Sequence, residues 1–212
     1  MPIESSKTST ATWRRWVKGQ IAALSGGGGG QWELISTTVP TSSPTVDITW
    51  DETAYDEVKL HMEGIYGASA YDRQLTVQLG YDDGASFHST SGDYAGTFRD
   101  LVSTTFTAMS PTTYHLCGHS VLNVDTSYGG LSGYVSVISG SGTNSGAIIE
   151  SRTHHVYGAN QIYGYEAKSY LVPLSVVTGS EADIDTVRLQ WDGSSINFAA
   201  GGTIRLYGLK NS

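Results

Sequence analysis

The sequence predicts an all-β protein, built as a jelly-roll-like antiparallel β-sandwich with a short amphipathic helix at its N-terminus. Glycine supplies 26 of the 212 residues, and charged side chains make up only 15% of the chain, against averages of about 7% and 25%. Aromatic residues make up 10% of the chain and include 13 tyrosines. Glycine for turns and tyrosine for strands are typical of a protein with many short strands. The same composition disfavours a helical bundle and a disordered chain.

The charge is unevenly distributed along the chain. Residues 1–30 hold four basic and one acidic side chain, whereas residues 31–212 hold eight basic and nineteen acidic ones. The acidic body is therefore expected to repel nucleic acid. Cys117 is the only cysteine, so no intrachain disulfide can form. We see no secretion signal and no apolar run of the roughly 20 residues that cross a bilayer, and we expect synthesis in a reducing cytosol without membrane insertion.

Residues 9–24 predict the helix. Its apolar residues recur at helical spacing and are Trp13, Trp16, Val17, Ile21 and Leu24. We therefore predict an anchor helix within residues 1–25, followed by a flexible polyglycine linker at 26–30. A helix this short is unstable alone in water, so something must cover its apolar stripe. We favour a sister copy or another protein, and the alternatives are the β domain of the same chain and a membrane surface.

The β-sandwich domain is predicted over residues 31–212. About ten segments alternate apolar and polar residues and are separated by turn residues. These segments are 32–39, 45–50, 55–66, 74–81, 114–124, 131–138, 147–157, 169–177, 186–191 and 203–209. A sandwich of jelly-roll type fits this series of short strands.

Three segments of the body carry a distinctive pattern. They read VDITWDETAYDEVKLHMEGI (46–65), LTVQLGYDDGASFHSTSGDYAG (75–96) and IDTVRLQWDGSSINFAAGGTIRLYGLK (184–210). The ending Gly-x-Ile-x-Leu-Tyr-Gly-Leu is the most specific part. Together the segments cover about a third of the chain. They resemble the β-sandwich virion proteins of tailed phages and prophages, including those of gene transfer agents, whereas residues 97–180 have no counterpart in the pattern.

The resemblance implies a structural or adhesive role on a virion, as a fibre, spike or decoration protein made in the host bacterial cytoplasm. It implies a homotrimer that is attached to capsid, tail or baseplate proteins and contacts a host-surface glycan, with no enzymatic activity and no cofactor. The competing interpretations are a free, lectin-like carbohydrate-binding module and a small glycan hydrolase.

The segment after the predicted strand at 74–81 indicates a structural turn. We expect the Asp82 carboxylate to accept backbone N–H groups of the turn, Gly84 to supply a positive φ, and Phe87 to fill the core beneath. A cation or ligand site is the alternative that we weigh less.

Two histidine-containing clusters are candidate sites. His115, Cys117 and His119 share one face of a predicted strand, and their side chains are of zinc-ligand type. However, one strand spaces alternate Cα atoms about 6–7 Å apart and rarely surrounds a metal, so we expect packing and no metal.

The segment 152–170 is rich in histidine and tyrosine. We interpret His154, His155, Tyr157, Tyr163 and Tyr165 as a glycan-binding or subunit-interface surface, with ordinary packing as the alternative. Neighbouring carboxylates at 51/52, 56/57, 82/83 and 181/183/185 are expected in solvated turns. With no Gly-x-Ser-x-Gly motif in the chain, the residues do not favour an enzyme.

Overall fold

The structure, a computed structural model, describes residues 31–68, 73–101, 105–118, 130–139, 146–157, 161–171, 184–192 and 196–210. In these ranges, thirteen strands form two antiparallel sheets and no helix is found. The all-β prediction is confirmed. The predicted anchor helix and glycine linker lie outside the described residues.

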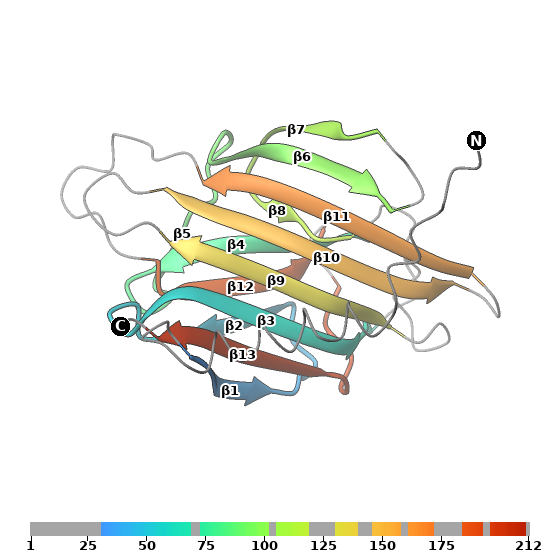
Figure 1. Ribbon diagram of the computed structural model, residues 1–212. Coiled ribbons are helices and arrows are strands. Elements are labelled where there is room, and N and C mark those ends of the chain that lie inside the picture. The colour runs from blue at the N-terminus through green and yellow to red at the C-terminus, as the bar shows by residue number, and fades with distance from the viewer. Residues whose placement is uncertain are drawn as a thin grey trace, which may run out of the picture.

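The large sheet has eight strands in the order β1-β13-β3-β9-β10-β11-β6-β7 and forms the front layer in Figure 1. Its strands are β1 (Trp32–Thr38), β13 (Thr203–Lys210), β3 (Tyr55–Ile65), β9 (Leu131–Ser139), β10 (Ala147–Tyr157), β11 (Gln161–Leu171), β6 (Tyr94–Asp100) and β7 (Thr107–Thr112).

The small sheet lies behind the large one in Figure 1, and its strand order is β2-β12-β4-β5. Its strands are β2 (Thr45–Thr49), β12 (Thr186–Trp191), β4 (Leu75–Tyr81) and β5 (Ser86–Phe87). The short strand β8 (His115–Leu116) pairs with β4 as well.

The strand pairs are nested along the chain. The first strand pairs with the last (β1 with β13), β2 pairs with β12, β3 with β9, and β4 with β5. Successive nested pairs alternate between the large and the small sheet. The strands β10, β11, β6 and β7 extend the large sheet beyond β9.

The main core lies between the two sheets. Alternate side chains of the large sheet, such as Leu60 and Leu206, meet those of the small sheet, such as Val77 and Leu189, and all four are fully buried. Each such side chain contributes about 1.5–3 kcal/mol through burial of its apolar surface. A second, smaller cluster around Met109 lies under β11 and β6. The inward side chains thus pack the two sheets against each other, and the outward side chains are not part of this core.

Candidate functional site

The β10–β11 hairpin carries most of the residues that were predicted as a glycan-binding or interface surface. Its register pairs His155 with Tyr163 and Thr153 with Tyr165. Because side chains alternate along a strand, His154 lies on the outer face of the large sheet, whereas His155 and Tyr165 lie on the inner face. His154 is exposed, but His155 is only 6% exposed and Tyr165 only 2%.

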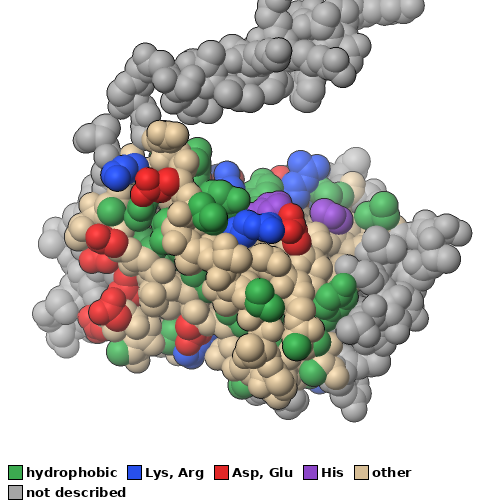
Figure 2. Space-filling view, turned by 90° about the horizontal axis from the view of Figure 1, so that it is seen from below, with side chains coloured by type: hydrophobic (Ala, Val, Ile, Leu, Met, Phe, Trp, Pro, Cys, Tyr) green, Lys and Arg blue, Asp and Glu red, His purple; other side chains and the backbone are tan. Residues whose placement is uncertain are grey.

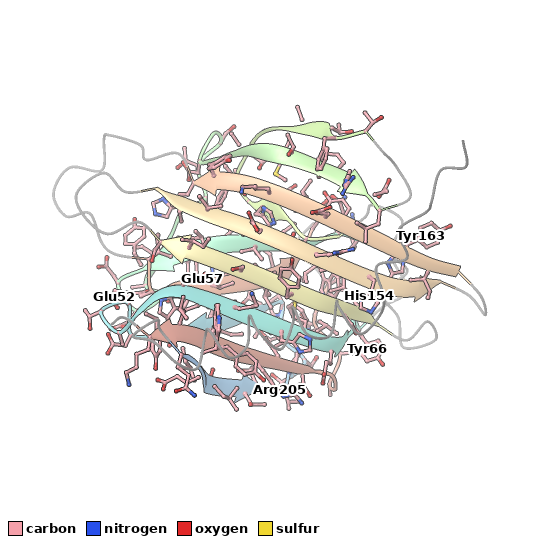
Figure 3. All side chains as sticks on the ribbon, viewed as in Figure 1. Glu52, Glu57, Tyr66, His154, Tyr163 and Arg205 are labelled. Atoms are coloured by element: carbon pink, nitrogen blue, oxygen red, sulfur yellow. The ribbon has the colours of Figure 1, made fainter. Side chains whose placement is uncertain are left out.

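This burial corrects the predicted surface. His155 and Tyr165 pack inside the domain, where a glycan cannot reach them. Tyr163 is half-buried, and its ring stacks on the His155 ring with centroids 5.4 Å apart. His154 and Tyr163 remain accessible near one end of the hairpin (Figure 3). Tyr157 is the last residue of β10.

His115 belongs to a buried polar network. Its side chain is fully buried, and its two ring nitrogens lie 2.7 Å from the Ser169 hydroxyl and 2.8 Å from the Ser151 hydroxyl. Burial lowers the pKa of His115 to about 3, so the imidazole is neutral at pH 7 and donates from one nitrogen while it accepts at the other. The network fastens β8 to β10 and β11, which is the packing role that the sequence favoured.

The Cys117 thiol is also fully buried, and burial raises its pKa to about 12. Reactive and metal-binding cysteines act as thiolates, so this thiol is inert at pH 7. The backbone carbonyl of Cys117 accepts a hydrogen bond from the Thr153 hydroxyl. His119 lies outside the described residues. Within the described ranges, no three His, Cys, Asp or Glu side chains gather as they would around a metal ion.

The turn between β4 and β5 differs from its prediction in how it is held. Gly84 has a φ of 77°, as predicted, but Asp82 and Asp83 also have a positive φ of 55°. The carboxylate that accepts a backbone N–H of the turn belongs to Asp185, whose Oδ2 lies 2.6 Å from the Asp83 nitrogen. Asp82 instead closes the turn through its backbone carbonyl.

Phe87 does not fill the core as predicted. Its ring is half-buried, and the Arg188 guanidinium lies over it, 3.7 Å from the ring centroid. Two nitrogens of Arg188 also donate to the two carboxylate oxygens of Asp47, at 2.8 and 2.7 Å. Sequence reasoning missed this stack because Asp47 and Arg188 are 141 residues apart. Only the pairing of β2 with β12 brings them together.

Three of the acidic residues that were predicted in solvated turns make structural hydrogen bonds. The Asp51 carboxylate accepts from the nitrogen and hydroxyl of Thr53 in a turn, and Glu57 accepts from the Ser136 hydroxyl at 2.7 Å. Asp185 is only 5% exposed, and its second oxygen accepts from the Thr186 hydroxyl. The expectation of a solvated turn is therefore wrong for Asp185.

The outer face of the large sheet carries charged and aromatic side chains that sequence reasoning did not assemble. The Lys59 ammonium lies between the rings of Trp32 and Tyr134, 4.8 and 5.4 Å from their centroids. Charge pairs link neighbouring strands: Arg99 with Glu166 (2.8 Å), Lys168 with Glu150 (2.6 Å) and Arg205 with Glu63 (2.7 Å). The Arg205 guanidinium lowers the pKa of Glu63. This face is the candidate functional surface of the domain.

No protein-family model, curated protein or solved structure matches the chain. Among the described residues, no helix has the length and apolar character to span a bilayer. The residues predicted as the anchor lie outside the described part of the chain and stay a prediction: Trp13, Trp16, Val17, Ile21 and Leu24.

Proposed function

We propose that this chain is a non-enzymatic structural protein of a tailed-phage or prophage virion, as a component of a fibre, spike or decoration. The observation that carries the proposal is the nested order of strand pairs, which alternates between two sheets. This order is that of a jelly-roll sandwich, here extended by the strands beyond β9. Viral capsid domains and lectin domains both use jelly rolls.

A fold alone does not imply a function, so the chemistry of the described residues also matters. Both ring nitrogens of His115 are hydrogen-bonded to serine hydroxyls. Cys117 is a buried thiol with a raised pKa. The Asp185 carboxylate holds a turn. These groups stabilise the fold, and their engagement favours a structural protein over an enzyme.

The proposed attachment to the virion is argued from the difference between the predicted N-terminal helix and the acidic β domain. The apolar stripe of the predicted helix needs a cover, and the glycine linker allows the acidic body to move relative to its attachment point. In the proposed virion, residues 1–25 bind sister copies and a capsid, tail or baseplate protein. The β domain projects outward as part of a homotrimer and contacts the host surface.

Deletion of residues 1–25 tests this role. We expect the shortened protein to stay soluble and folded, with the same β-type circular dichroism spectrum, because residues 32–210 supply both sheets and the described core. We expect it to be missing from particles purified from the strain that encodes it, as measured by quantitative mass spectrometry. Normal incorporation of the shortened protein would contradict the proposal.

A free carbohydrate-binding module is the second candidate. It is favoured by the exposed rings on the outer face, since Tyr170 is 50% exposed and His154 lies on the same side of β10 and β11. Tyrosine faces stack on sugars and their hydroxyls hydrogen-bond. Specific binding of the full chain on a glycan array, together with its absence from particles, would favour this module over the virion protein.

A further inference from the structure

The outer face of the large sheet differs in charge from the rest of the body. The registers place on it five of the eight basic and four of the nineteen acidic residues of 31–212: Lys59, Arg99, Arg152, Lys168 and Arg205 with Glu57, Glu63, Glu150 and Glu166. The rest of this segment then holds three basic and fifteen acidic residues. In Figure 2, basic, acidic and histidine side chains crowd along the upper border of the described surface.

The charges on this face are largely paired with one another. The three pairs that link neighbouring strands have N–O distances of 2.6 to 2.8 Å, and Glu57 accepts from Ser136. Lys59 is shared between two aromatic rings. Covering a paired charge is far less costly than burying a lone one. The three ion pairs can therefore be covered at low cost, whereas the exposed Arg152 makes no ion pair within the described residues and must stay in contact with water.

An apolar row crosses the same face. Successive registers place side by side, from β1 to β11, the residues Trp32, Leu209, Glu57, Ile138, Ile148 and Tyr170. Ile138 is 38% exposed and Tyr170 50%, and Leu34 in the next row is 53% exposed. Single exposed apolar residues are ordinary. In this row Glu57 is the only charged residue, and Ile138, Ile148 and Tyr170 adjoin one another on β9, β10 and β11, as in a patch that marks an interaction site.

From these observations we infer that the outer face of the large sheet packs against a second copy of this chain. The face spans the seven neighbouring strands from β1 to β6 in the sheet order. At about 4.8 Å spacing these strands give a width of about 29 Å, and about seven to eight residues along each strand give a length of about 25 Å. The resulting area of about 700 Å² is close to the roughly 800 Å² that each partner buries in a stable complex. The inference rests on the self-association that is part of the proposed function.

Charge explains why the partner is another copy and why it uses this face. The described residues outside this face include three basic and eleven acidic side chains, so two copies that meet through other described surfaces repel on average. This face carries five positive and four negative charges, a net charge of +1, so two copies that meet through it repel only weakly. The aromatic and aliphatic row then supplies the apolar centre that such interfaces need.

The test is the molar mass of the full chain in solution, measured by sedimentation equilibrium. The wild-type protein is expected at two or three times the chain mass of 22.6 kDa. The variant Ile138→Lys/Tyr170→Lys places two charges in the contiguous apolar part of the row and is expected to weaken association at least tenfold. The milder Tyr170→Ser removes one exposed ring without adding a charge and is expected to weaken it less.

Val39→Lys is the matched control, because Val39 is 56% exposed but lies beyond the end of β1 and outside the apolar row. It is expected to keep the wild-type mass. Thermal unfolding of each variant checks that the domain is folded. A monomeric wild-type protein, or face variants that keep the wild-type mass, would overturn the inference.

The outcome is separable from that of the attachment test. If deletion of residues 1–25 leaves incorporation into particles intact while the face variants dissociate, the proposed attachment is contradicted and the self-association through the outer face is supported. If the deletion abolishes incorporation but the face variants keep the wild-type molar mass, the self-association through the outer face is contradicted and the proposed attachment is supported.

Discussion

The imidazole of His115 lies between two serine hydroxyls in a fully buried position, so its loss would leave both hydroxyls unpaired. We expect His115→Ala to lower the free energy of unfolding by about 2–4 kcal/mol, because the variant leaves a cavity and unsatisfied polar groups. Urea unfolding at pH 7 measures the loss. His61→Ala is the control, since the His61 side chain is 49% exposed and its loss is expected to change stability by less than about 0.5 kcal/mol.

The same residue predicts a pH dependence. The pKa of His115 is about 3 in the folded protein, below the value of about 6.5 in an unfolded chain, so the unfolded state binds more protons between these values. Its contribution to stability is complete above pH 6.5 and is lost as the pH falls towards 3, by up to about 1.4 kcal/mol per pH unit. In His115→Gln, which cannot be protonated, this part of the slope is expected to disappear in urea unfolding measured from pH 7 to pH 4. Equal slopes in the two proteins would contradict the prediction.

At the scale of the elements, alternation of apolar and polar residues predicted several strands well. The predicted segments 147–157 and 186–191 coincide with β10 and β12, and 45–50 and 55–66 end one residue beyond β2 and β3. One face of each of these strands lies in the main core, so apolar and polar residues alternate clearly along the sequence. The three segments that carry the resemblance are also neighbours in the fold, because they supply nearly all of β2 to β5, the first three residues of β6, and β12 and β13.

Apart from the two-residue strand β5, the strands that the sequence did not predict lie in the extension of the large sheet. The inner face of β11 carries Ser169, which contacts His115, and the small side chain of Ala167, which packs in the cluster around Met109. Its polar-looking pattern was therefore interpreted as a surface. Strand β7 contains Pro111, which a strand tolerates at the edge of a sheet, where β7 lies. For the same reason His155 and Tyr165 were misplaced: the sequence shows residue types but not which side of the extension is covered.

The start of β13 gives a prediction at the same scale. Gly202 has a φ of 72°, and a Cβ atom at this position would lie 2.3 Å from the backbone oxygen of Gly64. Gly201 has a φ of 124° but open space around it. We expect Gly201→Ala to cost about 1–2 kcal/mol through backbone strain alone, and Gly202→Ala to cost clearly more, because the clash is with backbone that cannot move aside. Unfolding midpoints in urea compare the two, and equal losses would contradict this explanation of the first glycine of the C-terminal motif.

At the scale of the whole molecule, pairing between strands that are distant in the sequence determines which side chains lie together on the surface. The stack of Arg188 on Phe87 and Asp47, and the apolar row from Trp32 to Tyr170, depend on strands that are far apart in the sequence. The sequence predicted two parts of opposite charge and a jelly-roll-like β body, but it did not predict the extension of the large sheet beyond β9 or the near-neutral outer face. The near-neutral outer face is the basis of the inference that two copies of the chain associate.

The central claim is that this β domain is held on a virion by its N-terminal segment, and its most direct measurement is the copy number in purified particles. Two full-length variants are compared by quantitative mass spectrometry: Trp13→Ala/Trp16→Ala, which removes two large members of the apolar stripe, and Arg14→Ala/Arg15→Ala, which alters the opposite side of the predicted helix. We expect the tryptophan variant to be lost from particles and the arginine variant to be retained near the wild-type level. Wild-type copy numbers for the tryptophan variant, or no wild-type protein in particles at all, would contradict the account.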